Sequence, residues 1–228
     1  GSGFSTTYLT ESFEYDGTNW SEAGDILTAR EGAGGAGSAN TAALLFGGQT
    51  SAGPVTGATE SYNGSSWTTS PASMNTARTL VVGLGTQAAA LVVGGSPFVA
   101  ITEEFNGSAW LEVGDLNTGR DKMTMQAAGV TTAGLVAGGF SSAPTRVGST
   151  EFFNGTTWTE VADLATARGE GYGGGTGTLA IVASGNSAGS PNGDTATEEF
   201  SAPATTSVAQ IGQVWYNTTS DVLKGFGL

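Results

Sequence analysis

The sequence contains no cysteine and no histidine, and only 12% of its 228 residues are charged. Without cysteine there is no disulfide framework, no thiolate nucleophile and no thiolate metal ligand. Without histidine there is no imidazole to ligate a metal or to act as the base of a serine triad. We therefore expect no metal site of the nitrogen or sulfur type, no cofactor and no catalytic residue of these kinds.

Positive charge is also scarce, because seven Lys and Arg stand against twenty Asp and Glu, for a formal net charge of −13. Binding to a phosphate backbone needs a basic surface, so nucleic acid is a poor candidate partner. An anionic membrane surface is disfavoured for the same reason. No apolar run reaches the roughly 18 residues of a membrane span, so we expect no membrane insertion.

Glycine, in contrast, supplies 38 positions, and Val, Leu, Ile and the aromatic residues gather in short runs. This mixture favours short strands joined by tight turns over long amphipathic helices. A chain of this length is long enough for one large all-β domain.

A repeat with spacings of 47, 43 and 48 residues runs through the sequence. Each unit has a tryptophan, an arginine 10 or 11 residues later, a glycine-rich stretch, an apolar run ending in a small pair, and Thr-Glu before an aromatic residue. These markers, in register over four units, indicate a true repeat rather than a biased composition. The tryptophans are Trp20, Trp67, Trp110 and Trp158, and the arginines are Arg30, Arg78, Arg120 and Arg168.

Each unit is predicted to form four strands, named A to D in chain order. Strand A is the glycine-rich stretch, B the apolar run, C the Thr-Glu segment, and D begins at the tryptophan. Steps such as Asp16-Gly17 and Asn63-Gly64, between C and D, are typical of hairpin turns because both residues accept a positive φ. Four short strands in roughly 45 residues is the size of one β-propeller blade. The A strands are expected at 32–37, 81–85, 125–129 and 171–175.

The repeat resembles the Kelch repeat in its diglycine, its aromatic residue followed by Asp-Gly or Asn-Gly, its spaced tryptophan and the arginine that follows. Asn-Thr-Ala-Arg at 75–78, Ala-Thr-Ala-Arg at 165–168 and the Thr-Glu-Glu-Phe-Asn-Gly unit at 102–107 look closer still to Kelch-like arrays in tail and virion proteins of marine bacteriophages. This resemblance covers about residues 8–200. The segment 212–224 is separately similar to a short hairpin common in phage tail-fibre proteins.

We predict that residues 1–228 form a single domain, an all-β Kelch-like β-propeller with five blades. The repeats span about 8–200, the chain starts with an isolated C–D pair over 8–22, and a hairpin over about 210–228 is left over. We expect the last blade to join the N-terminal strands to this C-terminal hairpin, which would remove an exposed sheet edge. The rival is a longer array with open ends, or closure through a homo-oligomer.

Residues that occur once per unit are assigned to structure. Each repeat arginine is expected to form an ion pair with a Thr-Glu carboxylate, and each repeat tryptophan to pack between adjacent sheets. The candidate carboxylates are Glu11, Glu60, Glu103, Glu151 and Glu198.

Enzymes with related repeats fit poorly. The Asp-Gly and Asn-Gly turns resemble the Asp-box of sialidases but lack a residue, and Arg146 is the only arginine outside the repeat positions, too few for a carboxylate-binding arginine cluster. Galactose oxidase, which carries Kelch repeats, needs histidines and a cysteine thioether. A glycan hydrolase that uses paired carboxylates stays open as a third alternative, because twenty Asp and Glu are present.

The B–C loops, at 49–58, 96–101, 140–149 and 186–196, differ most between units. Variable loops on a rigid scaffold usually carry binding specificity, and in a propeller these loops share one face with the D–A loops. The resemblance implies a non-enzymatic structural or adhesion module on the phage particle surface, in a tail fibre or decoration, made in the host cytoplasm. Its partners would be other virion proteins and a host surface glycan or protein; the alternative is a generic Kelch interaction scaffold. The candidate ligand-binding residues are Gln49, Phe98, Phe140, Arg146, Asn186, Asn192 and Asp194.

Overall fold

The computed structural model describes residues 8–51, 53–123, 128–189, 193–202, 214–217 and 222–225. Every regular element in these ranges is a β-strand. The described residues include no helix that is long and apolar enough to cross a membrane. The predicted all-β fold is therefore confirmed.

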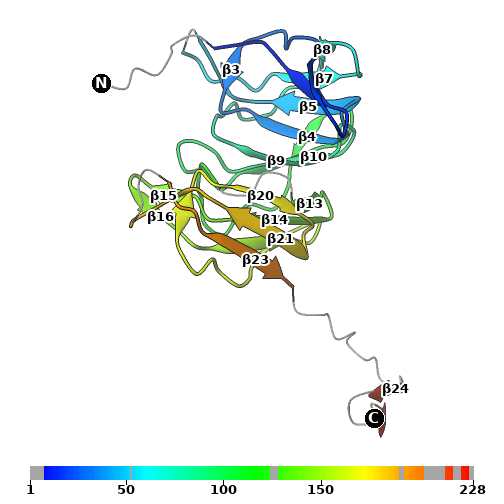
Figure 1. Ribbon diagram of the computed structural model, residues 1–228, viewed down its shortest axis with the longest axis vertical. Helices are drawn as coiled ribbons and strands as arrows, with labels where there is room; N and C mark the ends of the chain where they lie inside the picture. The colour runs from blue at the N-terminus through cyan, green and yellow to red at the C-terminus, as the bar shows by residue number, and fades with distance from the viewer. Residues whose placement is uncertain are drawn as a thin grey trace.

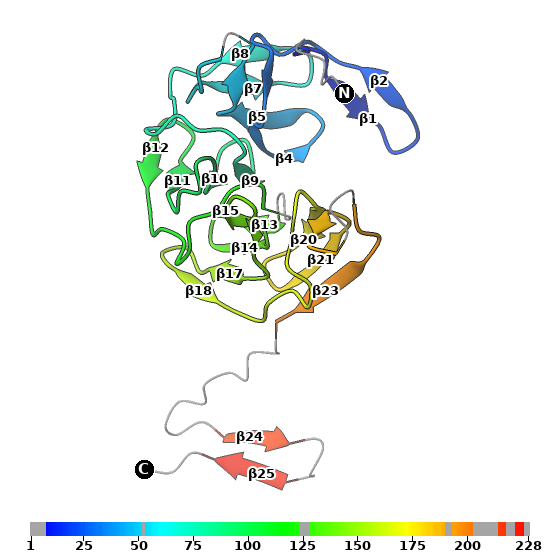
Figure 2. The same cartoon turned by 90° about the vertical axis from the view of Figure 1, so that its left-hand side faces the viewer.

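Three antiparallel four-stranded sheets follow one another along the chain, and a fourth sheet has three strands. The third and fourth sheets are joined by one parallel pair, Ala128 with Gly175. In Figure 1 the sheets are stacked from β7 and β8 at one end to β23 at the other, and Figure 2 shows them as an arc with β4, β9, β13 and β20 on its inner side.

The first sheet contains β4 (Gly34–Ala39), β5 (Ala42–Phe46), β7 (Thr59–Tyr62) and β8 (Trp67–Thr69). The second contains β9 (Val82–Gly85), β10 (Ala90–Val93), β11 (Thr102–Phe105) and β12 (Trp110–Glu112). The third contains β13 (Ala128–Val130), β14 (Ala133–Ala137), β17 (Thr150–Phe153) and β18 (Trp158–Glu160), and the fourth β20 (Tyr172–Gly175), β21 (Leu179–Ala183) and β23 (Thr197–Ser201).

These strands correspond to the predicted A, B, C and D strands, so each of the first three sheets is a complete blade. Three short ladders involve the B–C loops: two pair the segment that begins at a repeat arginine with the B–C loop of the same unit, and the third lies within one B–C loop. They are β3 (Arg30–Glu31) with β6 (Gln49–Thr50), β15 (Phe140–Ser142) with β16 (Thr145–Arg146), and β19 (Arg168–Gly169) with β22 (Asn186–Ser187).

The prediction of five blades closed by both ends of the chain is wrong. The described residues form four blade-like sheets, and β1 (Phe13–Tyr15) pairs only with β2 (Trp20–Glu22). Likewise, β24 (Val214–Asn217) pairs with β25 (Val222–Gly225), and no ladder in the described ranges joins this hairpin to β1 or β2. A short local loop loses far less entropy on closure than a pairing across most of the chain, which favours the two separate hairpins. The β1–β2 hairpin and β23 therefore form the two ends of the arc (Figure 2).

The hydrophobic core lies between successive sheets. Phe46 of the first sheet meets the Trp110 ring of the second edge-on, with 4.9 Å between ring centroids. Trp158 of the third sheet belongs to a cluster with Leu84 and Leu91 of the second. Trp110 and Trp158 are 3% and 5% exposed, as predicted for tryptophans between adjacent sheets, whereas Trp20 at the N-terminal end is 70% exposed.

Four ion pairs repeat from blade to blade and match the predicted pairing of each repeat arginine with a Thr-Glu carboxylate. Each arginine precedes strand A, and its partner glutamate lies on strand C of the same sheet, so each pair joins the D–A loop to its blade. In three of the pairs both side chains are at most 2% exposed; in the fourth, Glu198 is 21% exposed. The pairs are Arg30–Glu60, Arg78–Glu103 at 2.5 Å, Arg120–Glu151 at 2.6 Å and Arg168–Glu198 at 2.6 Å.

Glu11 was wrongly included among the candidate partners. Phe13 faces Glu22 across the N-terminal hairpin, as Glu60 faces Thr69 in the first sheet, so Phe13 occupies the register position of the paired glutamate. No ion pair among the described residues involves Glu11. Sequence spacing misplaced the match by two residues, because Thr-Glu-Ser-Phe at 10–13 fits the pattern of Thr-Glu before an aromatic residue, whereas the aromatic residue that faces the strand D tryptophan is Tyr15.

Candidate functional site

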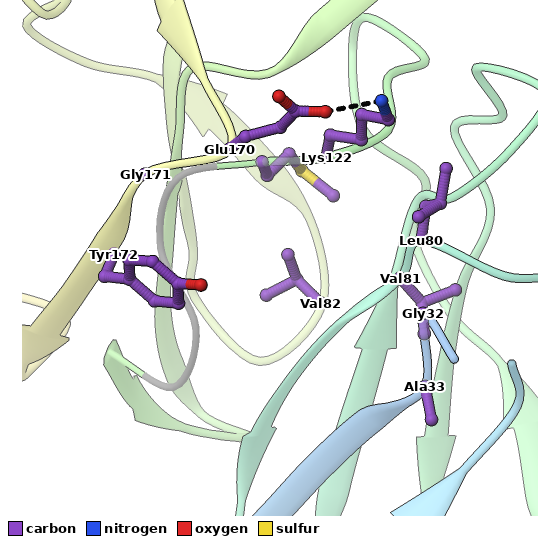
Figure 3. Close-up of a pocket in the computed structure, with 10 residues that line it drawn as sticks. Gly32, Ala33, Leu80, Val81, Val82, Lys122, Glu170, Gly171 and Tyr172 are labelled. Carbon is purple, nitrogen blue, oxygen red and sulfur yellow. Dashed lines mark hydrogen bonds and ion pairs between the residues drawn. The ribbon is translucent and has the colours of Figure 1, made fainter. Parts of the chain in front are cut away.

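A cavity of about 320 Å³ lies where the inner strands of all four sheets begin. Every sheet contributes to its lining, so it lies on the axis of the arc, and Figure 3 shows Leu80, Tyr172 and the Lys122–Glu170 pair around it. Its volume falls in the range of small-molecule sites. The lining residues are Gly32, Ala33, Leu80, Val81, Val82, Lys122, Met123, Glu170, Gly171 and Tyr172.

The cavity is framed by the residue two positions after each repeat arginine. This residue has a positive φ in every blade: 63° at Gly32, 55° at Leu80, 48° at Lys122 and 58° at Glu170. Their backbones form a chain around the axis, because Leu80 N–H donates to Gly32 O (2.7 Å), Lys122 N–H to Leu80 O (3.3 Å) and Glu170 N–H to Lys122 O (3.0 Å). A left-handed backbone at three non-glycine residues is unfavourable and is concentrated at functional sites in proteins.

Beside the cavity, five side chains form what we call the axial cluster. Lys122 Nζ lies 2.5 Å from Glu170 Oε1, and Asn186 Nδ2 donates to Glu170 Oε2 over 2.5 Å. Arg146 Nε donates to Asn186 Oδ1 over 2.6 Å. The Phe140 ring contacts both cations of the cluster. Lys122 Nζ and Arg146 Cζ lie 5.5 Å and 5.0 Å from the ring centroid, within cation–π range.

The axial cluster holds cations that the repeat does not use. Of the seven Lys and Arg, four are the buried repeat arginines, and Lys122 and Arg146 are two of the other three. The Lys122–Glu170 pair is accessible, with side chains 36% and 42% exposed, and pairs of this kind contribute at most about 1 kcal/mol. A ligand can therefore replace the contact between Lys122 and Glu170 with only a small loss of folding stability.

Asp121, next to Lys122, is a buried carboxyl group without a full set of partners. It is 4% exposed, and its Oδ1 has no hydrogen-bond partner among the residues that the structure describes. Burial raises the pKa of Asp121; the charge of Lys122 opposes this shift, and the charge of Glu170 adds to it. At the equivalent position of the second blade, Thr79 Oγ1 donates to Glu31 O over 3.3 Å.

We expect Asp121→Thr, which copies Thr79, to stabilise the fold at neutral pH by about 1–3 kcal/mol, the usual penalty of an unsatisfied buried polar group. Because folding raises the pKa of Asp121, this carboxyl group ionises at a lower pH in the unfolded chain than in the folded protein. As the pH rises from below 3.8, the free energy of unfolding therefore decreases until the pH reaches the folded pKa. The gain should therefore vanish in acid. Urea unfolding of both proteins at pH 3 and pH 7 measures it, with Asp16→Asn, the residue found in the other C–D turns, as the control. An equal gain at both pH values would contradict the proposed ionisation.

The structure brings together three of the predicted ligand-binding residues, Phe140, Arg146 and Asn186, and leaves others in their own loops. Gln49 Nε2 donates to Gly53 O over 2.9 Å within one loop. Asp194 accepts from Ser187 Oγ (3.2 Å) and from Ala196 N–H (2.9 Å). Phe98 lies in the second B–C loop with a φ of 56°; it does not line the axial cavity, and among the described residues it makes no cation–π contact with Lys122 or Arg146. Asn192 lies outside the described residues.

Sequence reasoning missed Lys122, Glu170 and Tyr172. The sequence signal was weak: the position two residues after the repeat arginine changes from Gly to Leu, Lys and Glu along the chain, but the positions on either side of it vary as well. Tyr172 is 68% exposed, whereas Val82 at the same place in the second blade is 2% exposed.

Comparison with known proteins bears on the fold. No protein-family model and no curated protein matches this sequence. A solved structure titled "Structure of YjhT" is similar, with a TM-score of 0.62, 14% sequence identity, and coverage of 77% of this chain and 66% of that one. The chain thus spans about two thirds of the length of that structure. At this identity the likeness speaks for the fold alone: this chain is an all-β protein with a propeller-like ring of sheets.

Proposed function

We propose that this chain is a non-catalytic binding module whose ligand contacts the axial cavity and the axial cluster. The observation that carries the proposal is the meeting of Phe140, Arg146 and Asn186, from two variable B–C loops, with Lys122 and Glu170 at the cavity. Binding specificity is commonly placed on such loops above a rigid repeated scaffold. A propeller-like fold also suits an interaction scaffold in general.

The ligand we favour is a glycan. The site offers three planar groups that can hydrogen-bond to sugar hydroxyls, namely an amide, a guanidinium and a carboxylate. They lie beside the exposed ring of Tyr172. Ligand sites typically combine an aromatic or apolar surface with a few polar groups of this kind. Hydrogen bonds rather than ion pairs should contribute most of the binding free energy, because Glu170 already neutralises Lys122 and the chain carries a net charge of −13.

The setting we propose is the surface of a bacteriophage particle, as a tail-fibre or decoration protein that adheres to a host surface and contacts other virion proteins. The support for this setting is the resemblance of the repeats, at 75–78 and 165–168, and of segment 212–224 to proteins of such particles. A generic protein-interaction scaffold is the second candidate, favoured by the propeller-like fold itself.

A glycan array combined with a reducing-sugar release assay tests the proposal. We expect binding without release of sugar. Arg146→Met and Asn186→Ala should weaken binding about 10- to 100-fold, the effect of losing a hydrogen bond with a charged partner. Gln49→Ala is the matched control, because Gln49 lies in a B–C loop and its side-chain amide donates to Gly53 O of the same loop; this variant should bind like the parent.

Three outcomes would count against this reading. Release of reducing sugar would overturn the non-catalytic proposal and favour a hydrolase that uses loop carboxylates. Glycan binding that survives Arg146→Met and Asn186→Ala would place the site elsewhere. An absence of glycan binding, with capture of a purified virion or host protein instead, would favour the interaction scaffold.

A further inference from the structure

Three junctions between neighbouring sheets share one contact. A tryptophan that starts strand D donates its Nε1–H to the hydroxyl group at the start of strand C in the preceding unit. The distances are 3.0 Å for Trp110 to Thr59, 3.0 Å for Trp158 to Thr102 and 3.3 Å for Trp67 to Ser12. Thr59 and Thr102 are fully buried at these junctions.

The N-terminal end of the arc presents the donor half of this junction, which no other part of the described chain covers. Trp20 is 70% exposed, and Phe13 and Tyr15 beside it are 57% and 48% exposed. The Trp20 and Tyr15 rings nevertheless stand 5.2 Å apart at 36°, the same arrangement as Phe105 with Trp110, at 5.2 Å and 37°. The donor half is therefore preorganised.

The C-terminal end presents the acceptor half. Thr197 faces Ala183 across the fourth sheet as Thr102 faces Val93 in the second, and Thr197 is exposed. Ile181, which holds the strand B position of Leu91, is 45% exposed although Leu91 is fully buried. This end thus carries the hydroxyl group and the aliphatic surface that a tryptophan covers at the internal junctions.

We propose that the two ends dock on each other between copies of this chain. Trp20 of one copy packs on Ile181 of the next and donates its Nε1–H to Thr197, which repeats the internal junction between molecules. The partner is a second copy because, within one chain, the ends lie at opposite ends of the arc (Figure 2), and no hydrogen bond or ion pair of the described residues joins 8–31 to 168–202. Such a contact is heterologous, so it builds closed rings or open chains of arcs.

Sedimentation velocity over a wide range of protein concentrations tests the proposal, and we expect the chain to associate reversibly. Trp20→Ser removes the donor half, Ile181→Asp disrupts the acceptor half, and each should weaken association at least about thirtyfold, as expected for a central anchor residue. Leu111→Ser is the matched control, because Leu111 is 54% exposed on β12, away from both ends, and should associate like the parent.

Mixing the two variants gives the sharpest result. Trp20→Ser keeps an intact acceptor end and Ile181→Asp an intact donor end, so each is expected to be monomeric alone and the mixture to form a dimer with one junction. Circular dichroism melting curves identify any variant that fails to fold. A parent chain that stays monomeric at all concentrations, association that both variants retain, or a mixture that stays monomeric although both variants are folded would overturn the proposal.

Discussion

Replacing Arg78 by methionine is expected to destabilise the fold by about 3–5 kcal/mol, because the Glu103 carboxylate then stays buried without its cation. Arg78 Nη1 lies 2.5 Å from Glu103 Oε1, and the two side chains are 1% and 0% exposed. Arg78 Nε also donates to Gly94 O over 2.8 Å, so a backbone carbonyl loses its partner too. For a chain of this size we expect the melting temperature to fall by roughly 6–20 °C, measurable by circular dichroism.

Two further variants separate the buried charge from a general effect of substitution. Arg78→Met/Glu103→Leu removes both charges and should recover part of the lost stability, since a buried ion pair replaced by apolar side chains is often tolerated. Glu170→Gln, which breaks the accessible pair with Lys122, should change stability by at most about 1 kcal/mol. If Arg78→Met melted like Glu170→Gln, the structural role of the repeat arginines would be wrong.

The second large effect is expected for Gly83→Ala on β9, at about 3 kcal/mol of destabilisation or more. A Cβ at Gly83 would lie 2.3 Å from Gly35 O and 2.7 Å from both Gly35 N and Phe46 Cζ. The obstacle is backbone of the neighbouring inner strand, which no rotamer change can move, so β4 and β9 would have to separate. Urea unfolding measures the loss.

Gly174→Ala on β20 is the matched control. It introduces the same methyl group on the inner strand of the fourth sheet, where a Cβ meets nothing within 4 Å. We expect a change close to zero, or a gain of roughly 0.4–1 kcal/mol from the lower entropy of the unfolded chain. Equal losses at both glycines would show that an inner-strand glycine matters for its backbone freedom rather than for the close approach of the sheets at the axis.

Much of the fold could be predicted because its signals are local or periodic. The Trp-to-Arg spacing and the apolar runs placed the A to D strands of the complete sheets, and the single arginine per unit anticipated pairs such as Arg120–Glu151. The N-terminal unit was misaligned, because Glu11 matches the spacing of a paired glutamate but Phe13 holds its place in the hairpin. Only hydrogen-bond register, which the sequence does not state, separates these two assignments.

The candidate site was predicted in part. Loop variation pointed to Phe140, Arg146 and Asn186, but Lys122 and Glu170 stand beside repeat arginines and were passed over with them. Their contact depends on the curvature of the arc. Lys122 and Glu170 are 48 residues apart and precede different sheets, yet Lys122 Nζ lies 2.5 Å from Glu170 Oε1.

By itself, then, the sequence determined the all-β class, the blade as the repeating unit, the exclusion of cysteine and histidine chemistry, and the division between repeated residues and variable loops. These follow from residue identity and spacing along the chain. The number of sheets, the lack of a ladder between the two terminal hairpins in the described ranges, the axial cluster and the uncovered faces of Trp20 and Ile181 were decided only by the tertiary structure. The physical reason is that each depends on how much each sheet rotates relative to the last, and this rotation is set by side-chain packing between blades.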